Sequence, residues 1–404
     1  MQLRCSECHY GLELHTRELE CPRCGELLEL IQGSVIKHPA DLKKLWLQRR
    51  TSNDARDLSG VWRFREFLPE YPAEAVVTMG EGNTPIVRGT RTAEYAGLKN
   101  LWFKHLGWNP TGCFKDLGMT VGVTEAKYVG AKVIACASTG NTSGSLAAYG
   151  SRAGLKSRVY LPAGKISVNK LAQTIDYGAE VVQIEGSFDA ALETVVRSST
   201  GGVYLLNSIN PFRIEGQKTT MFHLCEQFAW DPPDYVVLPG GNLGNTSAFG
   251  KAFEELKAAG LIERVPKLVV VQAEGANPFA TLWRTQANEL VPVAHPETAA
   301  TAIRIGNPRS WKKALRGVRF TDGFVLDVTD DEIAEAKAVI GSDGIGCEPA
   351  SATTLAALRK LRAENRIDRE ARVAAILTGH VLKDTDFIIK RHQREREASA
   401  VESK

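Results

Sequence analysis

The chain has 404 residues, of which 43% are hydrophobic and 24% charged, and its formal net charge is +3. This composition is that of a folded globular protein with well-filled cores, and it excludes a mostly disordered or fibrous chain. The near balance of 50 basic and 47 acidic residues argues against binding to nucleic acid or an anionic membrane surface. No apolar run is long enough for a transmembrane helix, and the polar residues after Met1 argue against a secretory signal.

Four of the eight cysteines lie close together near the N-terminus: Cys5, Cys8, Cys21 and Cys24. They form two C-x2-C pairs, and paired thiolates on tight turns can close a tetrahedral zinc site. A bound metal also replaces the hydrophobic core that such a small unit lacks. Residues 1–30 are therefore predicted to form a zinc-ribbon-like module with a structural Zn2+ ion. His9 and His15 are interpreted as bystanders, and four unliganded thiols are the less favoured alternative.

The cysteine pattern also bears on location. The other four cysteines are scattered along the chain, so the set does not form a disulfide framework. We therefore expect a reducing compartment, the cytoplasm.

From about residue 95, short β-branched runs alternate with alanine-rich stretches that are typical of helices. The runs are residues 132–136, 158–161, 180–184, 235–238 and 268–271. Near-continuous apolar runs separated by helices predict a parallel sheet that is covered on both faces. Ligands of such sheets bind at the carboxyl ends of the strands, so the loops after these runs are the informative ones.

Two of these loops are rich in glycine and small polar residues. Residues 137–144 follow the first run and open a helical stretch, and residues 239–246 follow the run at 235–238 in the same way. Backbone N–H groups at the start of a helix favour a carboxylate or a phosphate. The first loop is equally compatible with an ordinary capped helix. The second loop has neither dinucleotide nor Walker A spacing, yet it suits a single terminal phosphate.

A third segment, residues 109–118, places Lys115 after an Asn-Pro-Thr-Gly turn and next to Phe114. Most lysines are solvated surface residues. A partly buried lysine amine, however, has a lowered pKa and can attack a carbonyl carbon. Lys115 is therefore a candidate nucleophile.

Together these segments resemble the fold-type II pyridoxal-phosphate enzymes, and among them the threonine synthases, over roughly residues 78–385. The matching segments follow one order along the chain: 80–85, 109–118, 135–142, 207–218, 240–245, 302–308, 348–352 and 377–380. The resemblance implies an α/β fold of the tryptophan synthase β-like architecture, in which two three-layer parallel-sheet domains enclose a central cleft. It also implies a homodimer.

The resemblance further implies how the chain divides. Residues 31–119 and 226–385 would form the large domain that binds pyridoxal 5′-phosphate. Residues 120–225 would form a small mobile domain that binds the substrate carboxylate, and residues 386–404 a charged C-terminal tail.

Individual roles follow from the same resemblance. Lys115 would bind the cofactor covalently beside Phe114 and then act as general base and acid, while Asn141 would bond to the cofactor's phenolate oxygen and Thr378 would face its pyridine nitrogen. The cofactor phosphate would be held by Gly240, Gly241, Asn242, Leu243, Gly244 and Asn245. The substrate carboxylate would contact Ser138, Thr139, Asn141 and Thr142, and the substrate phosphate Asn207, Ser208, Arg213 and Asn242.

The implied reaction converts O-phospho-L-homoserine and water to L-threonine and phosphate, by γ-elimination followed by β-addition of water. The alternatives are another enzyme of this fold, such as a threonine or serine dehydratase or a cysteate synthase-like β-replacement enzyme, and a non-catalytic protein that binds a partner through its ribbon. The Asn-Ser-x-Asn-Pro-x-Arg segment at 207–213 favours the substrate with a γ-phosphate. The chain departs from the common family pattern at Cys113, Leu117, Gly240, Val381 and Thr385, none of which removes a predicted catalytic group.

Overall fold

The structure is a computed structural model that describes residues 1–33, 37–138, 140–162, 168–185, 202–391 and 393. Its largest sheet has six strands in the order β12-β11-β10-β13-β5-β4. These strands are β4 (Ile86–Arg88), β5 (Asn100–His105), β10 (Tyr235–Pro239), β11 (Lys267–Ala273), β12 (Phe324–Val328) and β13 (Arg372–Leu377). All neighbours are parallel except the edge strand β4, which runs antiparallel to β5.

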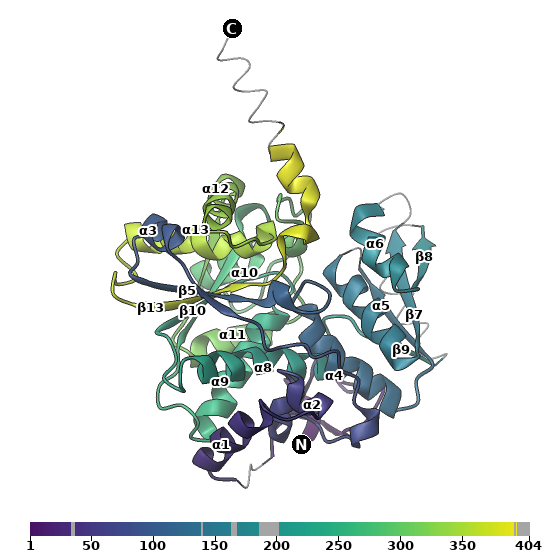
Figure 1. Cartoon of the computed structure of the whole chain (residues 1–404). Coiled ribbons are helices and arrows are strands. Elements are labelled where there is room, and N and C mark those ends of the chain that lie inside the picture. Colours follow the sequence, from purple (N-terminus) through teal and green to yellow (C-terminus); the bar gives the residue numbers. More distant parts are fainter. Residues whose placement is uncertain (34–36, 139, 163–167, 186–201, 392, 394–404) are drawn as a thin grey trace.

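Helices cover both faces of this main sheet. Figure 1 shows three of them above it, namely α3 (Arg91–Ala96), α12 (Asp330–Ser342) and α13 (Pro349–Ala363). Below it lie α8 (Pro211–Gln227), α9 (Gly244–Ala258) and α11 (Trp311–Phe320). Because side chains alternate along a strand, Val236 and Leu238 pack on the α8–α9 side and Val237 on the α13 side. The three layers follow from this alternation.

A second sheet has four parallel strands in the order β8-β7-β6-β9. They are β6 (Val133–Ala137), β7 (Lys156–Pro162), β8 (Glu180–Ile184) and β9 (Val203–Leu205). One face packs against α4 (Lys115–Tyr128), α5 (Asn141–Ala153) and α6 (Val168–Asp176). The predicted fold class is therefore confirmed: the chain is an α/β protein with two parallel sheets.

The N-terminal module is a small antiparallel sheet of β1 (Gln2–Cys5), β2 (Gly11–Leu12) and β3 (Leu28–Ile31). Between it and the main sheet the chain forms α1 (Pro39–Arg49), α2 (Ala55–Leu58), η1 (Trp62–Phe67) and η2 (Ala73–Ala75). The other short elements are η3 (Leu106–Trp108), η4 (Glu274–Ala276), α10 (Pro278–Thr285), η5 (Thr301–Ile303) and η6 (Val381–Lys383).

The C-terminal tail, expected at residues 386–404, is helical over residues 386–391. Residues 394–404 lie outside the described residues. No helix in the described ranges combines the length and apolar character needed to span a bilayer.

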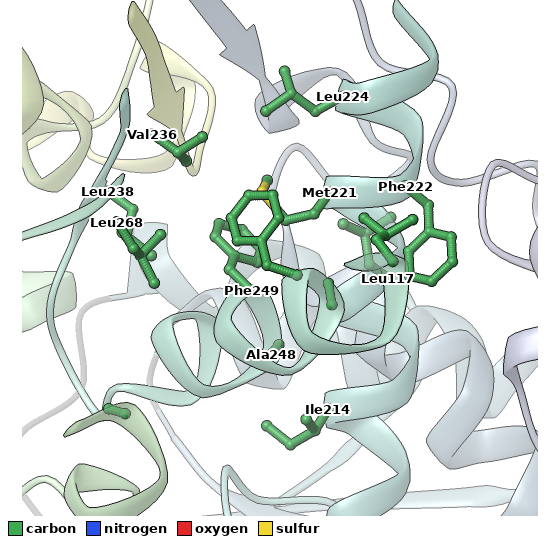
Figure 2. Close-up of a cluster of buried hydrophobic side chains, with 14 of the residues drawn as sticks. Leu117, Ile214, Met221, Phe222, Leu224, Val236, Leu238, Ala248, Phe249 and Leu268 are labelled. Carbon is green, nitrogen blue, oxygen red and sulfur yellow. The ribbon is translucent and has the colours of Figure 1, made fainter. Parts of the chain in front are cut away.

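The contact between α4 and α8 fixes where the site forms. A Cβ atom on Gly216 of α8 would lie 1.8 Å from the carbonyl oxygen of Leu117, so the two backbones meet directly. Leu117, one of the departures from the family pattern, is 2% exposed. It lies in the core between α8, α9 and the main sheet, with Met221, Phe222 and other apolar side chains (Figure 2). This departure is thus accommodated by apolar packing.

We predict that Gly216→Ala destabilises the protein, because the new methyl group meets backbone that cannot rotate away. The expected loss is about 2–3 kcal/mol in the free energy of unfolding, measured by urea denaturation. Gly341→Ala is the matched control, since Gly341 is exposed in α12 and a Cβ there meets nothing within 4 Å. That control should gain ~0.5–1 kcal/mol from helix propensity. Equal effects of the two substitutions would contradict the close approach of α4 and α8.

Candidate active site

Lys115 is the first residue of α4, and its surroundings favour a neutral amine. Its Nζ atom lies 4.0 Å from the centroid of the Phe114 ring, and the side chain is partly buried. Burial of the ammonium form, with a smaller contribution from the Arg213 guanidinium, lowers the pKa of Lys115 to about 8. An amine with this pKa is available as a nucleophile near neutral pH.

The turn before Lys115 is fixed from two sides. The Asp116 carboxylate accepts hydrogen bonds from the backbone N–H of Thr111 (2.7 Å), from its hydroxyl (2.6 Å) and from the Ser145 hydroxyl of α5 (2.6 Å). The backbone N–H of Phe114 donates to the carbonyl of Thr378 just after β13 (2.9 Å). Burial raises the pKa of Asp116 to about 6. These contacts set the direction in which the Lys115 side chain leaves the helix.

Asn141 and Thr378, two of the predicted cofactor residues, both bond to a third residue. The Glu348 carboxylate accepts from the Asn141 amide nitrogen (2.8 Å) and from the Thr378 hydroxyl (2.7 Å). Thr378 also lies 3.1 Å from the Ser351 hydroxyl. Gly379 leaves room for this carboxylate, because a Cβ there would lie 2.5 Å from it. Glu348 was not among the predicted site residues, although the segment 348–352 belongs to the resemblance.

The loop after β10 is built to expose backbone N–H groups. Leu243 has a left-handed backbone (φ +64°), its side chain is buried, and α9 starts at the next residue with no side-chain cap on its N-terminus. A Cβ on Gly240 would lie 2.8 Å from a side-chain methyl group of Val270, so a larger residue here would require Val270 to shift. In the part of the chain that the structure describes, the buried Thr246 hydroxyl in the first turn of α9 has no hydrogen-bond partner. Gly241, Asn242 and Gly244 are partly exposed and Asn245 is buried, so the loop can offer donors to a phosphate.

Arg213 lies in the first turn of α8 and is 1% exposed. Its Nη1 atom donates to the carbonyl oxygen of Leu206 (3.1 Å), and among the described residues its Nε atom has no acceptor. Burial lowers the pKa of Arg213 to about 10, which leaves it charged at neutral pH. Buried charges are normally paired, so this guanidinium suits an anionic ligand.

The other predicted substrate residues cluster at the ends of β6 and β9. Asn207 accepts a hydrogen bond from the backbone N–H of Ala137 through its Oδ1 atom (3.1 Å), which joins the two loops. Ser138, Thr142 and Ser208 are partly exposed there, whereas Thr139 lies outside the described residues. Helix α5 starts at Asn141 without a side-chain cap. A lysine with a lowered pKa, an uncapped helix start and a buried unpaired arginine together fit a phosphorylated aldehyde cofactor and an anionic substrate.

Comparison with known proteins agrees with this geometry. The family described as pyridoxal-phosphate dependent enzymes matches residues 77–379. A threonine synthase of Methanocaldococcus jannaschii is 46% identical over 393 residues, which cover 96% of this chain and 95% of that protein. The threonine synthase of Methanosarcina acetivorans is 45% identical and covers 96% of this chain and 93% of its own length. This chain is a member of the pyridoxal-phosphate-dependent threonine synthase family.

Solved structures share the fold of this threonine synthase family member at lower identity. A threonine deaminase isoform of Solanum lycopersicum superposes with a TM-score of 0.64 at 18% identity, covering 87% of this chain and 94% of that one. A diaminopropionate ammonia lyase of Escherichia coli gives 0.63 at 15% identity, covering 88% and 92%. Membership makes the protein a lyase whose cofactor is pyridoxal 5′-phosphate and whose substrate is a small molecule.

The four N-terminal cysteines of this family member also converge. Their sulfur atoms all lie within 4.8 Å of one another, with neighbouring pairs at 3.5 to 3.6 Å. A tetrahedral Zn–S site has sulfur atoms about 3.8 Å apart, given bonds of about 2.3 Å. Backbone N–H groups of Glu7, Cys8 and Arg23 point at the first sulfur of each pair, at 3.4 Å. Cys5 and Cys21 are buried, and Cys8 and Cys24 are exposed. The donor set therefore fits a zinc ion.

We predict that covalent capture of pyridoxal 5′-phosphate by the cofactor-free protein depends on pH with a midpoint near 8. The neutral amine is the reactive form, and its fraction is about one half at pH 8 and about one hundredth at pH 6. The capture rate, followed by absorbance, should rise about tenfold per pH unit below 8 and level off above it. A midpoint near the ordinary lysine pKa of about 10.4 would show that the amine is not perturbed.

Proposed function

We propose that this chain converts O-phospho-L-homoserine and water to L-threonine and phosphate. The observation that carries the proposal is Arg213, a buried guanidinium with no carboxylate partner among the described residues. It lies on α8, whereas the second candidate anion site is the start of α9. Two phosphate sites are what the enzyme needs when both its cofactor and its substrate carry a phosphate. The relatives named as threonine synthases support the same reaction.

Lys115 would do the proton transfers of this reaction. Bound pyridoxal 5′-phosphate supplies an electron sink that stabilises negative charge beside the substrate nitrogen. The Lys115 amine would take a proton from Cα and release it again before it takes a second proton from Cβ, since an ammonium group cannot accept another proton. It would then give a proton to Cγ after the phosphate has left. A pKa of about 8 serves both directions, because the amine can accept and release a proton near neutral pH.

The neighbouring side chains would bind and orient. Arg213, with Asn207 and Ser208, would hold the substrate phosphate, since a guanidinium can bond two phosphate oxygens at once. The start of α5 would hold the carboxylate, and the loop at 240–245 the cofactor phosphate. Asn141 and Thr378 would contact the cofactor's phenolate oxygen and pyridine nitrogen. Glu348 would position both of them, because its two oxygens bond one each.

We also propose that residues 120–225 move as a small domain that closes over the substrate and excludes water. The four-stranded sheet lies within this range, which supports the proposal. Helices α4 and α8 cross the expected domain boundaries at 119 and 226. A movement of the small domain would therefore either bend these two helices or move them together with it. We further propose that the four cysteines bind a structural Zn2+ ion, that the protein is a homodimer and that it lies in the cytoplasm.

The function is tested by comparing products from purified protein. O-Phosphohomoserine should give equal amounts of phosphate and threonine, and Lys115→Ala should give neither. A dehydratase would instead release 2-oxobutyrate from threonine or pyruvate from serine, and a β-replacement enzyme would act on phosphoserine. A protein whose absorbance does not change on addition of pyridoxal 5′-phosphate would be a binding protein rather than an enzyme.

We predict that Arg213→Lys lowers kcat/KM for O-phosphohomoserine about tenfold to a hundredfold. Lysine keeps the positive charge but loses the fork that holds two phosphate oxygens, a loss on the scale of one charge-assisted hydrogen bond. If the departing phosphate also orients the attacking water, kcat should fall together with kcat/KM. Threonine formation at the normal rate would argue against any contact between Arg213 and the substrate phosphate.

A further inference from the structure

The N-terminal module lies against both parallel-sheet layers rather than beside one of them. Leu27 packs with Ala135, Tyr160 and Leu205 of the four-stranded sheet. The neighbouring residues Leu28 and Leu30, on β3, pack instead into the core formed by α8, α9 and the main sheet. One short stretch of the ribbon thus fills two cores.

Polar contacts tie β3 to the helices below the main sheet. The buried Lys313 of α11 donates to the carbonyl oxygen of Leu28 (3.1 Å), and Lys251 of α9 donates to that of Leu30. Arg316 of α11 pairs with the buried Glu29 (2.6 Å). Helix α9 begins at the predicted phosphate loop, and β3 contacts this helix at Lys251, about two turns after its start.

The loop between the two cysteine pairs reaches α4. His15 lies 2.9 Å from the buried Glu125 carboxylate through its Nδ1 atom, and its ring packs on Tyr71 and Tyr128 at 5.6 and 4.6 Å between centroids. The other bond to this carboxylate comes from the Tyr71 hydroxyl (2.7 Å). Arg17 donates to the carbonyl oxygen of Val129 at the end of α4 (3.2 Å). His15, interpreted from the sequence as a bystander, therefore contacts the helix that starts at Lys115.

We propose that the metal-bound ribbon is a strap that holds the lysine helix α4 in place relative to the phosphate-loop helix α9, so that metal loss loosens α4 and weakens retention of pyridoxal 5′-phosphate. The proposal rests on the zinc site proposed above. The metal joins the turn at 5–8 to the turn at 21–24, and the loop carrying His15 and Arg17 lies between these turns. Without the ion the two turns are no longer joined to each other, so the loop depends on its own contacts to stay against α4.

Two kinds of change test the strap in the full-length holoenzyme. Zinc is removed with a chelator, and metal content is measured by mass spectrometry. Separately, His15→Ala removes the loop's contact to Glu125 of α4 but leaves all four cysteines. The matched control is His295→Ala, because His295 is exposed and far in sequence from the ribbon. Hydrogen exchange of α4 and the rate of cofactor release are the readouts, and neither requires turnover.

His15→Ala should keep one zinc per chain, speed hydrogen exchange in α4 about tenfold or more, and speed cofactor release, because Glu125 keeps only the Tyr71 hydroxyl. Zinc removal should produce the same change in α4, and His295→Ala should produce none. Unchanged exchange and cofactor release in His15→Ala would overturn the strap even if the zinc-free protein unfolds. Zinc-free protein with unchanged hydrogen exchange in α4 and unchanged cofactor release would overturn it too. Neither result would affect the proposed reaction, which is assayed separately by threonine formation.

Discussion

The proposed chemistry depends on an amine and a guanidinium that share one buried region. Lys115 and Arg213 come from the first turns of α4 and α8, and the direct backbone contact at Gly216 brings these two helices together. Burial, with a smaller contribution from the Arg213 charge, lowers the pKa of Lys115 to about 8, so about one tenth of the amine is neutral at pH 7 while Arg213 keeps its charge. The close contact between α4 and α8 thus places the candidate nucleophile and the candidate anion site next to each other.

Much of the fold could be predicted from the sequence, and the exceptions have physical causes. The runs that became β6, β8, β10 and β11 contain several valines or isoleucines, and the run in β7 is Arg-Val-Tyr-Leu, as expected for buried parallel strands. Strand β5 includes Lys104 and His105, which are buried polar residues, and β13 contains two alanines, so neither gives a strong strand pattern. Strand β9 has three residues, too few for a periodic signal.

The site was predictable where its residues are close in sequence. Lys115 and the loop at 240–245 stand out because turns, glycines and strand ends mark them locally. Glu348 did not stand out, because its partners Asn141 and Thr378 are distant in the chain and only the folded structure brings them together. The same is true of His15 and Glu125, which are separated by 110 positions. Sequence spacing reports short-range geometry, and these two carboxylates are placed by long-range packing.

The glycines along the α4–α8 contact have a consequence for redesign of the enzyme. Gly118, Gly122 and Gly216 let the two helices meet without side chains between them. A Cβ atom on Gly118 would lie 3.0 Å from the Arg213 carbonyl oxygen. A Cβ atom on Gly122 would lie 3.1 Å from the Arg213 side chain and 2.6 Å from that of Leu206. Any larger residue there would displace the nucleophile and the anion site together. A redesign for a different substrate should therefore keep these glycines. It should vary the more exposed positions Ser138, Asn207 and Ser208, where a new side chain would alter the proposed substrate contacts without moving the Lys115 amine.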